Sequence, residues 1–215
     1  MANRKRAPFL YLIIVVAAVM VIAGCGKNGS GIGKGDSAAA SAKLMNWDKM
    51  PDMQIDLDKS YLANFKTTKG DFTVKLFTED APVTVNNFVF LAREGFYEGL
   101  TFHRIIESFM IQSGDPKGNG YGTPGYSIPD ELSTDIKYEE GIVAMANASK
   151  PNSGGSQFFI CTGPDAANLN REPNYSIFGK VESGMDVVRA ISETPMKNNL
   201  PSEKIIINSI EIVEQ

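Results

Sequence analysis

The spacing of apolar and polar residues becomes regular at residue 61 and predicts a β-hairpin there. Residues 61–67 and 71–77 are two strand-like runs joined across Lys69 and Gly70, a turn-forming pair. In the second run the apolar side chains alternate with polar ones and share one face, at Phe72, Val74 and Leu76. A period of two is that of a strand with one buried face.

A helix is predicted directly after the hairpin. Pro82 suits the first helical turn, Asp80 supplies favourable charge there, and Gly95 ends the run. Between them apolar residues recur at helical spacing, at Val85, Phe88, Val89 and Ala92. The pattern indicates one amphipathic helix that buries a single stripe.

Six further runs are strand-like, and a second short helix is predicted at residues 185–192, before the last of them. The runs are 101–106, 109–113, 142–147, 156–161, 176–182 and 204–213. With the hairpin they make eight strands. Eight mostly antiparallel strands with two helices favour a closed barrel, because closure removes exposed edges. Periodicity alone does not distinguish a barrel from a sandwich.

The first 25 residues have the pattern of an export signal rather than of a folded domain. Arg4, Lys5 and Arg6 form a positive segment, and residues 9–24 are a charge-free, largely apolar run. The run ends in Val-Ile-Ala-Gly before Cys25, an order that resembles a bacterial lipoprotein signal, in which the cysteine carries lipid and becomes the mature N-terminus. The alternative is an uncleaved membrane anchor, although the run is short against the ~20 residues of a span.

The basic flank stays on the cytoplasmic side, so both interpretations place the rest of the chain outside the cytoplasmic membrane. We therefore expect a signal peptide at residues 1–24 and a protein held by lipid on Cys25 at the extracytoplasmic face of a bacterial cell membrane. Residues 25–43, rich in Gly, Ser and Ala, are interpreted as a flexible tether. Residues 44–60 form an N-terminal extension whose role the sequence leaves open, and residues 61–215 form one domain.

Composition indicates an ordinary globular chain of acidic character. The formal net charge is −4, and it becomes more negative once the N-terminal cations are removed. A domain that acidic, with no basic run, gives no indication of nucleic-acid binding. With Cys25 committed to lipid, Cys161 stands alone, so we expect no intramolecular disulfide and interpret Cys161 as a small buried side chain. We expect the domain to be a monomer.

Two stretches combine charged, amide, small and aromatic side chains in a way that is typical of a reaction site without a nucleophile. Residues 102–115 place the guanidinium of Arg104 near Phe109 and Met110, and residues 146–162 add amides, small residues and aromatics. The glycine-rich residues 114–131 lie between the two stretches. A phosphate-binding loop would be followed by a Lys-Ser/Thr pair at the start of a helix, and this segment is not. The pattern therefore favours an irregular surface loop beside the candidate site.

Together, and at compatible spacing, the two stretches resemble the cyclophilin family of peptidyl-prolyl cis-trans isomerases, over residues 61–213. The resemblance implies a mainly β fold, an eight-stranded closed antiparallel barrel capped by two α-helices. It implies an enzyme that needs neither cofactor nor metal, with Arg104 as the catalytic residue. It also implies a substrate-binding set of Phe109, Met110, Gln112, Ala146, Asn147, Ala148, Gln157, Phe159, Leu169 and Tyr175, of which Phe109, Met110, Phe159 and Leu169 would grip the proline ring.

Rotation about an X-Pro bond changes no bond to a heavy atom, so such a site has unusual requirements. The barrier of roughly 18–20 kcal/mol is the lost amide resonance, and a site lowers it by stabilising the twisted amide, whose nitrogen is a better hydrogen-bond acceptor. A guanidinium is always charged and holds its donors in a rigid plane, which suits this task. His103, the only histidine, is interpreted as structural, because no proton is transferred and a lone histidine makes a poor metal site.

The sequence departs from the family at one end of the groove. Asn168 stands where many cyclophilins have a tryptophan before Leu169, and Tyr175 replaces the usual histidine. The resemblance therefore does not extend to cyclosporin sensitivity, for which that indole is a principal contact.

The leading hypothesis is a membrane-tethered isomerase that acts on proline-containing exported polypeptides. The main alternative is a proline-peptide-binding chaperone or adaptor with incidental isomerase activity. Retention of Arg104 favours the enzyme, because a pure binder needs only the pocket. A lipoprotein that captures small solutes would need two α/β lobes, which this strand pattern does not supply.

Overall fold

One curled antiparallel sheet organises the part of the chain that the structure describes. The structure is a computed structural model and describes residues 45–132, 135–197 and 200–215. The predicted signal peptide, the predicted lipidation site Cys25 and the predicted tether at residues 25–43 lie outside the described residues. Within those residues no helix is both long and apolar enough to cross a membrane.

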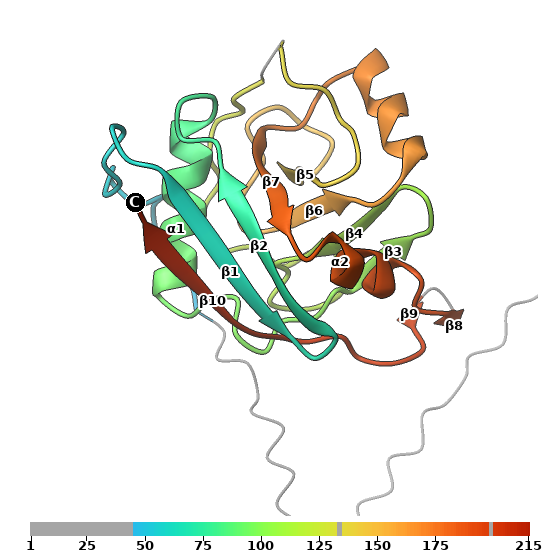
Figure 1. Cartoon of the computed structure of the whole chain (residues 1–215). Helices are drawn as coiled ribbons and strands as arrows, with labels where there is room; N and C mark the ends of the chain where they lie inside the picture. The colour runs from blue at the N-terminus through green and yellow to red at the C-terminus, as the bar shows by residue number, and fades with distance from the viewer. Residues whose placement is uncertain (1–44, 133–134, 198–199) are drawn as a thin grey trace, which may run out of the picture. The chain divides into compact units, whose positions relative to one another are not determined.

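Eight strands form the main sheet in the order β10-β1-β2-β7-β5-β6-β4-β3, and each neighbouring pair is antiparallel (Figure 1). The strands are β1 Tyr61–Thr67, β2 Gly70–Leu76, β3 Arg104–Ile106, β4 Met110–Ser113, β5 Ile142–Met145, β6 Phe158–Cys161, β7 Ile177–Ser183 and β10 Ile207–Glu214. A separate two-stranded ribbon, β8 Met196–Lys197 with β9 Leu200–Pro201, is not predicted by the sequence pattern.

The sheet is strongly curled but open between its edge strands β3 and β10. The segments that precede these strands are joined by one bridge, Thr101 to Ile206, and the N–H of Phe102 donates to the carbonyl of Ile205 at 3.0 Å. The predicted fold class, mainly β with eight antiparallel strands, is confirmed. The barrel predicted as closed is therefore an open, strongly curled sheet, whose edges meet through short backbone contacts and not through a ladder between β3 and β10.

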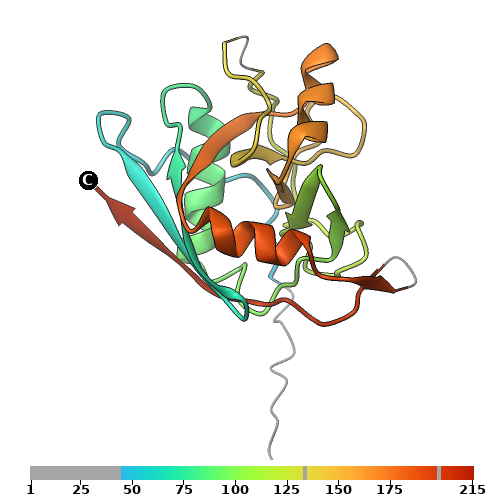
Figure 2. The same ribbon diagram turned by 45° about the vertical axis from the view of Figure 1, so that its right-hand side comes forward.

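Three helices accompany the sheet. The helices α1 Pro82–Arg93 and α2 Met185–Ser192 lie where the apolar spacing predicts them, and Figures 1 and 2 show them apart from one another against the curled sheet. The third, η1 Pro164–Arg171, is a 3-10 helix that the sequence pattern does not predict. Only Ala166 is buried among the eight residues of η1, so the helix has no apolar stripe by which the sequence could predict it.

The start of α1 is capped by a residue far away in the sequence. The carboxylate of Glu131 accepts hydrogen bonds from the backbone N–H of Val83 at 2.9 Å and of Thr84 at 2.7 Å. The Thr84 hydroxyl donates to the same carboxylate at 2.7 Å. The negative charge expected from Asp80 at this helix start is thus provided by Glu131, where it satisfies N–H groups that have no partner within the helix.

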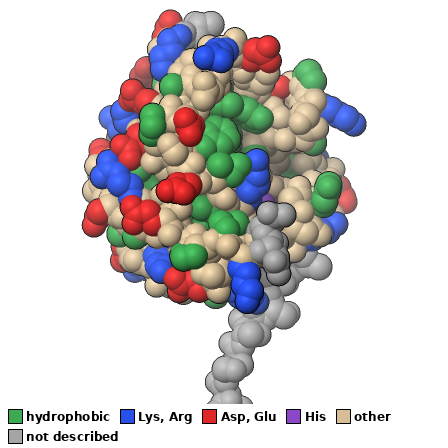
Figure 3. All heavy atoms as spheres, turned by 90° about the vertical axis from the view of Figure 1, so that its right-hand side faces the viewer, with side chains coloured by type: hydrophobic (Ala, Val, Ile, Leu, Met, Phe, Trp, Pro, Cys, Tyr) green, Lys and Arg blue, Asp and Glu red, His purple; other side chains and the backbone are tan. Residues whose placement is uncertain are grey.

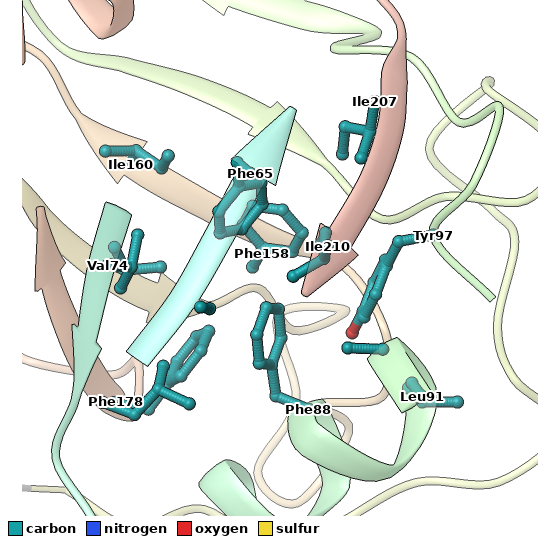
Figure 4. Close-up of a cluster of buried hydrophobic side chains, with 14 of the residues drawn as sticks. Phe65, Val74, Phe88, Leu91, Tyr97, Phe158, Ile160, Phe178, Ile207 and Ile210 are labelled. Carbon is teal, nitrogen blue, oxygen red and sulfur yellow. The ribbon is translucent and has the colours of Figure 1, made fainter. Parts of the chain in front are cut away.

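Buried side chains from α1, α2 and the inner face of the sheet form the main core. Phe88 of α1 packs among aromatic rings of three strands, with ring centroids 6.2 Å from Phe65, 5.7 Å from Phe158 and 5.2 Å from Phe178 (Figure 4). The N-terminal extension joins this core at Ile55, which is buried. Met45 and Trp47, near the first described residues, are also partly buried against this core, so the extension packs on the domain at both places.

The strands β3 to β6 contribute to two separate apolar clusters, because successive side chains point to opposite faces. Ile105, Ile111 and Ile160 belong to the main core. Their neighbours on these strands point outward and join residues from other segments in a second group, here called the outer-face cluster: Met110, Tyr138, Ile142, Ala144, Phe159, Cys161, Ala166 and Ile177. The sheet is thus buried on both sides in this region.

Candidate functional site

Strand register brings the central residues of the predicted site together. Arg104 of β3 lies opposite Gln112 of β4, and Gln112 lies opposite Phe159 of β6. Residues directly opposite each other in an antiparallel pair project from the same face. The guanidinium, the amide and the aromatic ring therefore form one row across three strands, on the outer side of the sheet.

A cavity of about 350 Å³ opens along this row and is here called the main cavity. Its lining contains eight predicted site residues, Arg104, Phe109, Met110, Gln112, Ala146, Asn147, Phe159 and Tyr175, together with Ser149, which was not predicted. Figure 3 shows the corresponding face of the molecule, where hydrophobic side chains gather in a hollow next to a basic side chain. The cavity thus combines an apolar surface with a single cation.

The floor of the main cavity belongs to the outer-face cluster. Met110 and Phe159 are 1% and 5% exposed, so they support the cavity without being free to leave it. The ring of Tyr175 meets that of Phe159 edge to face, with centroids 5.2 Å apart and an interplanar angle of 87°. This is a preferred geometry for aromatic pairs, and it gives the cavity a fixed wall.

A second hollow, the side cavity, continues the main cavity over the glycine-rich loop. It has a volume of about 220 Å³ and shares Gln112, Ala146 and Asn147 with the main cavity. Of the three remaining predicted residues, Ala148 and Gln157 line this side cavity. The glycine-rich loop, predicted as an irregular surface segment, contributes residues 120–123 and Tyr126 to its wall.

Leu169 is the predicted pocket residue that does not appear in the lining of either cavity. It lies on η1 and is partly buried against the outer-face cluster, to which Met110 and Phe159 of the main cavity also belong. Its contact with the proline ring stays a prediction.

Three side chains form a chain of hydrogen bonds that ends on the glycine-rich loop. Arg104 Nη1 donates to Gln112 Oε1 at 3.1 Å, and Gln112 Nε2 donates to Gln157 Oε1 at 3.0 Å. Gln157 Nε2 then donates to the carbonyls of Gly120 at 3.1 Å and Gly122 at 2.9 Å. A guanidinium can only donate and a carbonyl can only accept, so the direction of every bond in the chain is fixed.

Tyr138 holds the backbone on which Tyr175 stands. Its hydroxyl donates to the Tyr175 carbonyl at 2.6 Å and accepts from the Tyr175 N–H at 3.1 Å. Burial raises the pKa of Tyr138 to about 12, so the hydroxyl keeps its proton. Asn170 fixes Tyr138 in turn, accepting from its N–H at 2.9 Å and donating to its carbonyl at 3.0 Å. No local sequence pattern indicates either role, because the partners are more than 30 positions apart.

Asn147 is anchored in the same way at the junction of the two cavities. Its Nδ2 donates to the carbonyl of Asn174 at 2.8 Å, and its Oδ1 accepts from the N–H of Ser149 at 3.1 Å. The two bonds fix the side-chain amide of Asn147 where the two cavities meet.

The residues interpreted as structural are buried. Burial raises the pKa of the Cys161 thiol to about 12, which leaves no thiolate to act as a nucleophile. Burial also lowers the pKa of His103, against a weaker opposing effect of Asp115. In the described ranges, His, Cys, Asp and Glu side chains form no group of three that could hold a metal ion.

Fold and site together define a class of protein in which a curled antiparallel sheet carries an apolar cavity beside a fixed guanidinium. The residues that line this cavity include no carboxylate, histidine or cysteine. Such a lining suits a largely apolar, uncharged ligand.

Comparison with known proteins identifies the family. The sequence model described as "Cyclophilin type peptidyl-prolyl cis-trans isomerase/CLD" matches residues 62–212. The chain belongs to this family and is a peptidyl-prolyl cis-trans isomerase.

Relatives and solved structures agree with this assignment. A peptidyl-prolyl cis-trans isomerase of Helicobacter pylori is 43% identical over 141 residues, covering 64% of this chain and 84% of the relative. Peptidyl-prolyl cis-trans isomerase B of Streptomyces anulatus is 39% identical over 170 residues, covering 70% and 95%. The crystal structure of a cyclophilin-type isomerase of Cryptosporidium parvum superposes with a TM-score of 0.67 at 35% identity, covering 72% of this chain and 98% of that one.

Proposed function

We propose that the main cavity binds the proline ring of a polypeptide and that Arg104 catalyses rotation of the bond before it. The observation that carries this proposal is the row of Arg104, Gln112 and Phe159 across three strands. The ring of a bound proline would rest on Phe159 and Met110, and the guanidinium would donate to the prolyl nitrogen as the amide twists. A structure of the Cryptosporidium parvum relative was obtained in the presence of the dipeptide Ala-Pro, which supports a proline ligand.

The catalytic task is within reach of such a site. Lowering a barrier by about 6 kcal/mol brings the uncatalysed process, which takes tens to hundreds of seconds, to roughly a millisecond. One donor fixed in advance acts strongly where water is partly excluded, because no reorganisation is needed as the amide twists. The hydrogen bond to Gln112 provides that fixation here.

Replacing Arg104 tests the proposal. Arg104→Ala should lower kcat/KM for an Ala-Pro peptide at least tenfold in a protease-free assay, while the thermal midpoint stays nearly unchanged because the side chain is exposed. Arg104→Lys keeps the charge but loses the planar donors, and it should remain impaired. Wild-type turnover in Arg104→Ala would reject the catalytic role, and retained peptide binding without any isomerisation in the wild type would favour the chaperone or adaptor alternative.

We also propose that the protein works outside the cytoplasmic membrane on exported proline-containing polypeptides, held there by lipid on Cys25. The support is the order of cations, apolar run and cysteine at the start of the sequence. In cells, Cys25→Ser should release the protein from the membrane fraction or leave its signal uncut. Membrane association and lipid labelling that do not change in the Cys25→Ser variant would reject this proposal while leaving the isomerase assignment intact.

A further inference from the structure

The N-terminal extension lies outside residues 62–212, the part matched by the family, yet it is attached to the domain at both of its ends. Residues 45–55 are here called the strap. At one end the ring of Trp47 packs against Phe90 and Phe96, with centroid distances of 5.2 and 5.9 Å. At the other end Asn86 of α1 accepts from the N–H of Gln54 at 2.7 Å and donates to the carbonyl of Asp52 at 3.1 Å.

The strap also contacts the glycine-rich loop. The backbone N–H of Trp47 donates to the carbonyl of Pro124 at 2.9 Å. Gly125 lies so close to the strap that a Cβ added there would come within 2.3 Å of the Trp47 carbonyl oxygen. Its φ of +103° is also one that other residues rarely adopt. Loop and strap are therefore packed backbone to backbone at this point.

The two halves of the loop are held by different groups. In the first half, the buried carboxylate of Asp115 accepts from the N–H of Lys117 at 2.7 Å and of Asn119 at 2.8 Å. In the second half, Pro124 is held by the strap, and the hydroxyl of Tyr126 donates to Asn87 of α1 at 2.7 Å. The strap thus supports the part of the loop that Asp115 does not reach.

Both halves of the loop line the side cavity, and the second half contributes Thr123 and Tyr126. Ala146, Asn147 and Ala148 of the predicted binding set line the same cavity of about 220 Å³. In a cavity this small, a shift of Thr123 and Tyr126 changes which side chains fit. Because it adjoins the main cavity, the side chain it receives must belong to a residue near the proline.

We propose that the strap is a specificity element, in which Trp47 fixes residues 123–126 and thereby selects the side chains accepted near the proline. Trp47 is a positioning residue, because it acts through Pro124 and the loop rather than on the substrate. The inference rests on the proposed use of the main cavity as the proline site. It concerns selectivity between peptides, whereas the role of Arg104 concerns the turnover of every peptide.

Steady-state kinetics of the full chain on a peptide series test this inference. The series holds one X-Pro bond in an alanine background and moves a single leucine from three residues before the proline to two residues after it. In Trp47→Ala, KM should rise at least fivefold for the peptide whose leucine enters the side cavity, with kcat within twofold. KM for the all-alanine peptide should change less than twofold. Trp47→Phe should restore the wild-type preference, and Met53→Ala, at an exposed position on the same strap, should leave it unchanged.

Amide hydrogen exchange gives a second readout that does not depend on activity. In Trp47→Ala the amide of Gly125, which donates to the Thr123 hydroxyl at 3.2 Å, should exchange faster than in the wild type. The amides of Lys117 and Asn119, held by Asp115, should keep their protection. If Trp47→Ala does not fold, Trp47→Leu takes its place, because it keeps an apolar side chain on Phe90.

The outcomes separate the possibilities. A selective rise in KM together with faster exchange at Gly125 supports the strap as a specificity element. Equal losses for all peptides, no change for any peptide, or unchanged exchange at Gly125 would overturn it. If Arg104→Ala retains wild-type turnover, the proposed function itself fails, whatever Trp47 does.

Discussion

Arg104 donates a hydrogen bond to Gln112 across the β3–β4 pair, with 3.1 Å between Nη1 and Oε1. The guanidinium is therefore held by a neutral acceptor rather than by a carboxylate. A neutral partner fixes the plane of the guanidinium without neutralising its charge, so the charge remains available to the twisted amide. Gln112 can play this part because Gln157 orients its amide from the other side.

The first prediction concerns Gln112. Gln112→Ala should lower kcat/KM about fivefold, which corresponds to a hydrogen bond worth about 1 kcal/mol. The thermal midpoint should change little, because Gln112 is only half-buried. Gln112→Glu still accepts from Arg104, but it places a carboxylate beside the guanidinium and can no longer donate to Gln157, so it should also lower kcat/KM. A Gln112→Ala enzyme as active as the wild type would show that Arg104 needs no such support.

The second prediction concerns the cap of α1. Glu131→Ala removes the acceptor of two backbone N–H groups and one hydroxyl, and should lower the free energy of unfolding by about 1–3 kcal/mol in urea denaturation. Glu139→Ala breaks a surface ion pair with Lys180 and should cost less than about 1 kcal/mol. Isomerase activity should survive both changes. Equal losses of stability in the two variants would contradict the capping role.

The third prediction follows from His103. Burial lowers its pKa in the folded protein, whereas in the unfolded chain it titrates near 6.5. Between the two pKa values the unfolded state binds more protons, so stability should fall as the pH drops below about 6.5. In His103→Gln, the loss of unfolding free energy between pH 7.5 and 5.5 should be smaller. An identical loss in wild type and variant would refute this contribution. The activity of the folded enzyme should be flat over pH 6.5–8, because a guanidinium does not titrate there.

Local periodicity was enough to predict most of the strands and helices, whereas the choice of a barrel rested on the family resemblance. The hairpin of β1 and β2 and the helices α1 and α2 lie within one residue or two of their predicted positions, because each buries one face and its sequence repeats with that face. The helix η1 was not predicted, because only one of its residues is buried and its sequence therefore shows no apolar period. Helix capping by Glu131 could not be foreseen, because it joins segments almost 50 positions apart.

The candidate site was predictable where it lies on strands and less so where it lies on loops. Arg104, Met110, Gln112 and Phe159 are brought together by register alone. Ser149 and Tyr138 were missed, because their positions depend on loop conformation and on tertiary hydrogen bonds. Leu169, expected in the pocket, packs against the cluster that contains Met110 and Phe159, and its contact with the ligand stays a prediction.

The outer-face cluster has a consequence for attempts to engineer this enzyme. Met110 and Phe159 are proposed to contact the ligand, and they are also buried members of this cluster. Enlarging the pocket with Phe159→Ala should therefore lower the free energy of unfolding by about 3–5 kcal/mol. Ala148 and Ser149 are exposed at the edge of the cavities, so replacing them should not remove buried packing. Retargeting this scaffold to new peptides should therefore begin at its border, with the centre left untouched.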